Sequence, residues 1–302
     1  MSTLESEARS ARLATEDWQS SAPSGRLFRG SRQSLREILG QRELLGLLVR
    51  RELKARYKDS TLGFLWSLLR PLTVLLVYYI AIGKFLGAAR SIPEFAVYIF
   101  TGLTAWQLFL EIVTTSTASI VSNAGLVKKV YLPREVFPLS AVGGALFTFL
   151  TQMIILTAAV VVTGQVPTGS RLLYIPLSVA VLLVFATAIG LVLAAVNVYL
   201  RDIQYLVEIS TTIFFWISPT VYSWKLVSNA LDGSWLETLY LCNPVTLGVL
   251  GMQRAIWVAG DGEPVPDGLA GRLTIALGVG LVLLWLSQRL FARLEGNFAQ
   301  EL

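Results

Sequence analysis

The chain contains no histidine and one cysteine, Cys242. Without histidine it lacks the commonest general base and metal ligand of proteins, so imidazole chemistry is excluded. A single cysteine excludes an intramolecular disulfide. Charged residues are also scarce, at 15% of 302 residues, whereas hydrophobic residues make up 54%. These proportions exclude an ordinary soluble domain and indicate a polytopic membrane protein.

Several motifs are missing as well. The printed sequence has no G-x-x-x-x-G-K-[ST] phosphate loop, so this chain does not bind ATP through that motif. It has no Asp-x-Asp or paired-carboxylate cluster, which a membrane-embedded enzyme acting on polyprenyl phosphates would need. No nucleic-acid-binding module is present either. Residues 1–34 lack the apolar core of a secretory signal and are predicted to form a disordered cytoplasmic tail.

A basic amphipathic segment runs directly into an apolar one within residues 43–79. Residues 35–60 are predicted to form an amphipathic interface helix on the cytoplasmic membrane surface, with its apolar arc in the acyl boundary and its cations at the headgroups. An ordinary juxtamembrane anchor is the alternative. Glu52 and Arg56 interrupt the pattern, and they either pair with each other or face a protein partner. The arc holds Leu48, Val49, Leu53 and Tyr57, and the basic side holds Arg50, Arg51, Lys54 and Lys58.

Six segments have the length and apolarity of a spanning helix, which needs about 20 residues. They are residues 63–86, 94–120, 138–163, 172–199, 205–224 and 272–291. The predicted fold is therefore all-α, with a transmembrane domain over residues 61–302. Lysine and arginine are more frequent beside the inner ends than beside the outer ends, which places both termini in the cytoplasm. The inner set is Arg50, Arg51, Lys54, Arg56, Lys58, Lys128, Lys129, Arg134, Arg201, Arg289 and Arg293; the outer set is Lys84, Arg90, Arg171, Lys225, Arg254 and Arg272.

Residues 225–271, between the fifth and sixth spans, are too apolar for an aqueous loop. Asn243-Pro244 lies in the middle of this segment, and a residue before proline disfavours the helical region. We therefore expect two half-length helices that enter the membrane from outside and return, as a re-entrant hairpin. A seventh span over residues 235–258 is the alternative.

Four ordered motifs resemble the membrane subunits of ABC exporters for polysaccharides and polyol phosphates. They are LGFLWSLLRPL (62–72), VKKVYLPREVFPLS (127–140), NVYLRDIQYLVEISTTIFFWISPTVYS (197–223) and NPVTLGVLGMQRAIW (243–257). The resemblance covers about residues 40–295. Members of that family export O-antigen, teichoic acid and galactan.

The resemblance implies a homodimer that works with two cytoplasmic ABC ATPase subunits, which bind the ATP and magnesium. The cargo would be a polyprenyl-diphosphate-linked glycan that moves outward across the cytoplasmic membrane. Residues 126–135 correspond to the coupling helix that contacts the ATPase. The residues predicted to dock the ATPase are Glu52, Arg56, Lys128, Lys129 and Arg134. The alternative within transporters is a permease of the related drug or lipid ABC exporters.

Aromatic residues are frequent in the first, second and fifth predicted spans. Most aromatic residues of a membrane protein belong to its core or to its interfacial belts. Flat amphipathic rings also contact sugar faces without selecting one linkage, which suits a sliding polymer. The residues predicted to line the substrate path are Tyr78, Trp106, Phe215 and Trp216, with Arg70 near the inner mouth. Arg70 either offers its charge to the diphosphate or extends back to the inner surface.

Overall fold

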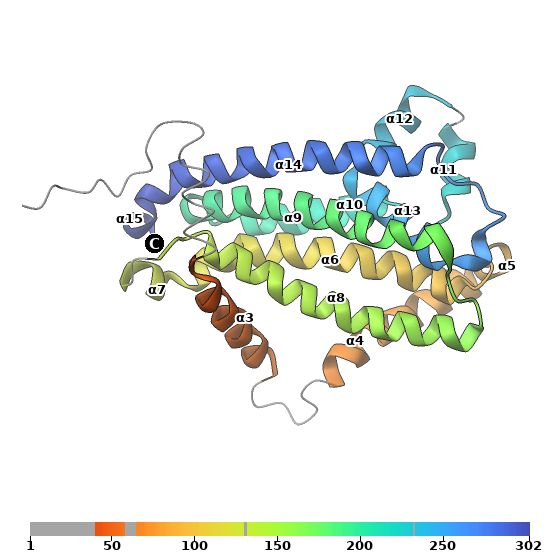
Figure 1. The fold of residues 1–302 in the computed structure, drawn as a ribbon, viewed down its shortest axis with the longest axis horizontal. Helices are drawn as coiled ribbons and strands as arrows, with labels where there is room; N and C mark the ends of the chain where they lie inside the picture. The colour runs from red at the N-terminus through yellow and green to blue at the C-terminus, as the bar shows by residue number, and fades with distance from the viewer. Residues whose placement is uncertain (1–39, 58–64, 130–131, 232) are drawn as a thin grey trace, which may run out of the picture.

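The computed structural model describes residues 40–57, 65–129, 132–231 and 233–302 (Figure 1). Every regular element within these ranges is a helix, which confirms the all-α class. The predicted tail, the first residues of the predicted interface helix and the junction at residues 58–64 lie outside the described residues. The predicted coupling segment is described except at residues 130–131.

Five helical stretches are long and apolar enough to cross a membrane. They match predicted spans one to four and six. The first is α4 (Leu65–Tyr78) continued by the π-helical η1 (Tyr79–Phe85), followed by α6 (Phe95–Ser122), α8 (Val136–Thr163), η2 (Gly169–Leu173) joined to α9 (Tyr174–Tyr199), and α14 (Leu269–Leu294).

The fifth predicted span is shorter than expected. It appears as α10 (Ile203–Ile217), which has 15 residues and is about 22 Å long at 1.5 Å per residue. Ser218 leaves the helix with extended backbone angles because Pro219 follows it. Since the hydrocarbon layer is about 30 Å thick, α10 alone does not reach across it, and a crossing here stays a prediction.

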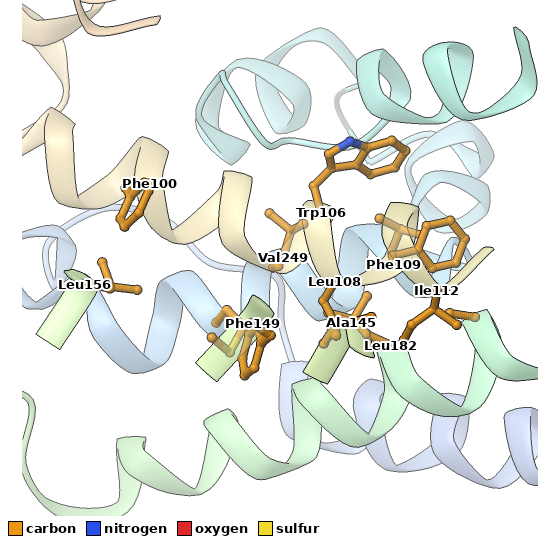
Figure 2. Packing of buried hydrophobic residues seen from close by; sticks show 14 of the residues in the cluster. Phe100, Trp106, Leu108, Phe109, Ile112, Ala145, Phe149, Leu156, Leu182 and Val249 are labelled. Atoms are coloured by element: carbon orange, nitrogen blue, oxygen red, sulfur yellow. The ribbon is translucent and has the colours of Figure 1, made fainter. Parts of the chain in front are cut away.

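Helix α6 forms the centre of the bundle. It packs against α8, α9 and the short helix α13 (Pro244–Ile256). Leu108 and Ile112 of α6 contribute to a buried cluster with Ala145 and Phe149 of α8 (Figure 2). Trp106 projects from the other side of α6, away from α8 (Figure 2). Helix α6 therefore packs on α8 with one side and carries Trp106 of the same core on another.

The outer segment folds as the Asn-Pro pair predicts. Helix α12 (Trp235–Leu241) stops before Asn243, and α13 begins at Pro244 with the Asn243 side chain accepting a hydrogen bond from the Val245 N–H at 3.0 Å. An asparagine cap and a proline in the first turn are typical of a helix start. Helix α13 is almost wholly buried among α6, α9 and α14. One uninterrupted helix over residues 235–258 is excluded, because the segment is broken at Asn243, and the re-entrant hairpin and the seventh span both stay predictions.

The bundle has two distinct ends (Figure 1). At one end lie α7 (Ala124–Lys129), α15 (Phe298–Glu301) and the start of α3 (Arg42–Tyr57), and we refer to it as the α7 end. At the other lie α5 (Ala88–Ser91), α11 (Trp224–Leu231) and α12, and we refer to it as the α12 end.

Candidate functional site

The four aromatic residues predicted to line a path form one continuous cluster. Phe215 of α10 is its centre, with ring centroids 6.1 Å from Tyr78 of α4, 5.4 Å from Trp106 of α6 and 5.4 Å from Trp216. The contacts to Trp106 and Trp216 are edge-to-face, a favoured geometry for aromatic pairs. Residues from three helices far apart in sequence therefore share one site.

This aromatic cluster changes from buried to exposed along its length. Trp106 is 6% exposed, Tyr78 and Phe215 are half-buried, and Trp216 is 56% exposed. The cluster thus begins in the protein core and ends on an outward face of the chain. Flat rings on such a face offer repeated weak contacts to a sugar or to another apolar surface.

Arg70 lies on α4, eight residues before Tyr78, or about 12 Å along the helix axis. Its side chain is exposed and forms no ion pair with the described residues. The position is compatible with both predicted roles, a cation for the diphosphate or an extension to the membrane surface.

The three cations predicted for the coupling loop are in two different environments. Lys128 and Lys129 are exposed at the end of α7. Arg134, in contrast, is half-buried, donates a hydrogen bond to the Glu295 carbonyl and lies 5.7 Å from the ring centre of Phe298. The guanidinium of Arg134 therefore contacts the C-terminal segment of its own chain, and the two lysines are the cations of the group that face outward.

Phe298 anchors that C-terminal segment. Its ring is fully buried and packs edge-to-face on Phe291 and Tyr199, at centroid distances of 5.6 and 6.0 Å. The Tyr199 hydroxyl donates a hydrogen bond to the Leu294 carbonyl at 2.7 Å. Helix α15 thereby packs against α9 and α7.

A charge network around the buried Glu111 joins α3 to the bundle. The Arg56 guanidinium forms ion pairs with Glu111 of α6 and, at 3.0 Å, with Glu52 of its own helix. Glu111 is 8% exposed and also accepts a hydrogen bond from the Thr148 hydroxyl of α8 at 3.1 Å. Burial acts to lower the pKa of Arg56, but the hydrogen bonds and charges of both carboxylates outweigh it and raise the pKa. Arg56 is therefore a permanent cation.

Sequence reasoning missed the partner of Glu111. No cation lies near Glu111 in its own helix, and Arg56 precedes it by 55 residues. The available signal was the rule that an acid inside an apolar span must be paired, together with an arginine that interrupted the amphipathic pattern of the preceding helix. Glu208, an acid within the predicted span 205–224, is exposed on α10.

Two adjacent glycines let α3 approach α8 closely. A Cβ atom on Gly143 would lie 2.6 Å from Val49 Cγ2, and one on Gly144 would lie 3.2 Å from Glu52 Oε1. Leu48, at 6% exposure, belongs to a buried cluster shared with α8 and α9. Part of the apolar arc of α3 therefore packs on protein, whereas the prediction placed it in the acyl boundary.

At the α12 end, Arg171 secures the end of α13. It donates hydrogen bonds to the carbonyls of Arg254 and Ala255, at 2.9 and 3.2 Å, and pairs with Asp261 at 2.9 Å. The last carbonyls of a helix lack partners within the helix, and a cation there is stabilising. Arg171 is thus a structural residue of the outer segment.

No group of three His, Cys, Asp or Glu side chains suited to a metal ion occurs among the residues that the structure describes. The polar network at α3 and the aromatic cluster at α10 are the arrangements on which a functional assignment rests.

Several membrane-length apolar helices around a buried central helix define a multi-pass membrane protein. Residues 43–257 match the model of the ABC-2 type transporter family, and the chain belongs to this family. The matched region begins in α3 and ends just after α13, so it includes the charge network and the aromatic cluster.

Relatives of similar length support the same membership. The chain is 32% identical over 268 residues to an O-antigen export system permease protein, RfbA, of Myxococcus xanthus, covering 89% of this chain and 98% of the relative. An RfbA of Klebsiella pneumoniae is 28% identical over 258 residues, covering 85% and 94%. The polysialic acid transport protein KpsM of Escherichia coli is 25% identical over 186 residues, covering 60% and 70%.

Proposed function

We propose that this chain is the membrane subunit of an ATP-driven exporter that moves a polyprenyl-diphosphate-linked polysaccharide from the cytoplasmic to the outer side of the membrane. The observation that carries the proposal is the similarity over 98% of the length of an O-antigen export permease. Two other relatives are named for capsule polysaccharide export and for polysialic acid transport, and their names support a polysaccharide cargo.

In this proposal two copies of the chain assemble with two copies of an ABC ATPase that binds the ATP and magnesium. The α7 end faces the cytoplasm, where the exposed Lys128 and Lys129 dock the ATPase. Both termini are then cytoplasmic, because six crossings return the chain to its starting side. The fifth crossing is formed by α10 together with the residues that follow it, and α12 and α13 form the hairpin that enters from outside.

The glycan path lies along the aromatic cluster, between the two copies. The exposed Trp216 supports this placement, because the cluster reaches an outward face of the single chain that a second copy can complete. Rings bind sugars weakly and without strict geometry, so successive residues of a polymer pass without breaking a tight site at each step. Arg70 supplies a cation for the lipid diphosphate near the inner mouth.

Deletion of the gene in its native host tests the proposal. Surface glycan is expected to disappear while the lipid-linked form accumulates inside, and restoration of the chain is expected to reverse both effects. The readouts are glycan immunoblots of intact cells and mass spectrometry of extracted lipids. Loss of a drug-efflux phenotype with normal surface glycan would contradict the proposal.

A further inference from the structure

Three contacts fix α3 to the bundle, and each is made by a different kind of interaction. Arg51 donates a hydrogen bond to the side-chain oxygen of Asn123, at the end of α6. Arg56 pairs with Glu111, which precedes Asn123 by about three turns of α6. Val49 packs directly over Gly143 of α8. Helix α3 therefore contacts α6 through two side chains and α8 through a third.

The pair between Arg56 and Glu111 is unfavourable to open. Glu111 is almost fully buried, and the structure gives its carboxylate the Arg56 guanidinium and the Thr148 hydroxyl as partners. Removing the cation would leave a buried charge with a neutral hydroxyl alone, which is strongly destabilising. The network therefore favours a state in which α3 stays docked.

The glycine contact has the same consequence. A Cβ at residue 143 would overlap Val49, so α3 lies at a separation from α8 that only glycine permits there. Close-packed surfaces of this kind move together or separate, because they deform little.

Glu111 shares α6 with Trp106, five residues earlier, and Trp106 contacts Phe215 in the aromatic cluster. A displacement of α3 that is carried by Arg56 thus reaches the helix that holds the buried end of the cluster. The connection consists of the Arg56–Glu111 ion pair, about one and a half turns of α6, and the contact between Trp106 and Phe215.

We infer that Arg56 is a positioning residue that joins α3 to α6 and α8 as one rigid body, so that movement imposed on α3 by the ATPase passes directly to the aromatic cluster. The inference rests on the proposed export function. It assigns Arg56 to the linkage between α3 and Glu111, in place of a direct contact with the ATPase.

An engineered disulfide between α3 and α8 tests whether the role of Arg56 is to hold α3 against the bundle. The Cβ of Val49 and an ideal Cβ on Gly143 are 3.7 Å apart, within the range of a disulfide. The variant Val49→Cys/Gly143→Cys is made in a Cys242→Ser background, because Cys242 is exposed and free. It is combined with Arg56→Ala and, as a matched control, with Lys54→Ala, an exposed cation of the same helix.

With the chain co-purified with its ATPase and reconstituted in vesicles, Arg56→Ala is expected to lower glycan export per assembled complex by about tenfold or more while basal ATP hydrolysis persists. Lys54→Ala is expected to leave export unchanged. Oxidation should restore export in the Arg56→Ala background, leave the Arg56-containing protein active, and be reversed by reductant.

Three results would overturn the inference. If oxidation stops export when Arg56 is present, α3 must separate from α8 during the cycle. If the disulfide forms in the Arg56→Ala background but does not restore export, Arg56 acts in another way. The rate of disulfide formation gives a readout without transport and should fall in Arg56→Ala; an unchanged rate counts against the inference. If the parent protein exports no glycan at all, the proposed function fails, which is distinct from these outcomes.

Discussion

Phe215 is the residue on which the aromatic cluster depends, because its ring contacts Tyr78, Trp106 and Trp216. Phe215→Ala is expected to shorten the exported glycan chains several-fold without preventing assembly, because it removes the central surface over which a polymer would slide. The measurement is the length distribution of surface glycan, normalised to the amount of assembled complex.

Phe214→Ala is the matched control for that experiment. Phe214 is the neighbouring ring on α10 and is exposed, and no described ring contact joins it to the cluster. It should leave chain length unchanged. Equal effects of the two substitutions, or lower assembly with normal export per complex, would show that the cluster is only part of the core.

Gly143 is a second residue whose identity the structure explains. Gly143→Ala places a Cβ 2.6 Å from Val49 Cγ2 and is expected to destabilise the protein by about 1–3 kcal/mol, the usual cost of overpacking. The measurement is the thermal unfolding midpoint of the purified protein in detergent.

Removal of the overlapping methyl groups provides the control for that variant. Val49→Ala/Gly143→Ala should be more stable than the sum of the single changes indicates, because the two sites are in contact. Strict additivity would mean that α3 and α8 are not closely packed at this point.

At the scale of elements, α7 presents two exposed cations, Lys128 and Lys129, at the α7 end. Lys128→Glu/Lys129→Glu is expected to weaken ATPase binding and to reduce export by about tenfold, because two attractive charges become repulsive at an interface. Pull-down of the ATPase and export per cell measure the two effects.

Lys84→Glu/Arg90→Glu makes the same charge change with two exposed residues near the opposite end of the bundle. This control should retain ATPase binding. An equal loss in both variants would point to a general effect of charge on insertion or folding, and α7 would then not be the docking element.

Cysteine labelling can show directly on which side of the membrane the two ends of the outer segment, residues 225–271, lie. Cysteine substitutions at Ser228 and Asp267, in a Cys242→Ser background, should both react with an impermeant reagent added outside, because a hairpin returns to the side from which it entered. A substitution at Lys128 should react only after the membrane is opened. Labelling of Asp267 from the cytoplasmic side alone would contradict the hairpin.

Much of the element order could be predicted from the sequence, because spans are set by local apolarity and length. The Asn243-Pro244 break also has a local cause, the conformational restriction before proline. Helix α10 ended earlier than predicted for the same reason, since Pro219 lies inside the segment 205–224, which was treated as one span. The prediction weighed apolarity there and overlooked the proline.

Contacts between distant elements could not be predicted, because hydropathy does not carry them. The sequence indicated that Arg56 interrupts an amphipathic pattern and that Glu111 lies within an apolar span, but only the packing of α3 against α8 brings the two side chains together. The contact of Arg134 with Phe298 likewise depends on the packing of α15 beside α7. The aromatic cluster was predicted as a set because its members share a chemistry, and the structure brings the four rings together.

At the scale of the whole molecule, the proposed function requires that movement at the α7 end be converted into movement of the aromatic cluster within the membrane. The printed sequence has no phosphate loop, and in the proposed function the energy comes from an ABC ATPase on another polypeptide. The purified chain alone is expected to hydrolyse no ATP.

ATP-driven transfer of a lipid-linked glycan is the measurement that tests the central claim most directly. The chain and its co-purified ATPase are reconstituted in vesicles with the ATPase outside, and polyprenyl-diphosphate-linked glycan from the native host is included in the outer leaflet. Addition of ATP is predicted to move the glycan into the lumen, where a glycosidase added outside cannot digest it, and a non-hydrolysable ATP analogue should not. If an assembled complex hydrolyses ATP and the glycan remains as digestible as in vesicles without the chain, the assignment as a polysaccharide exporter is wrong.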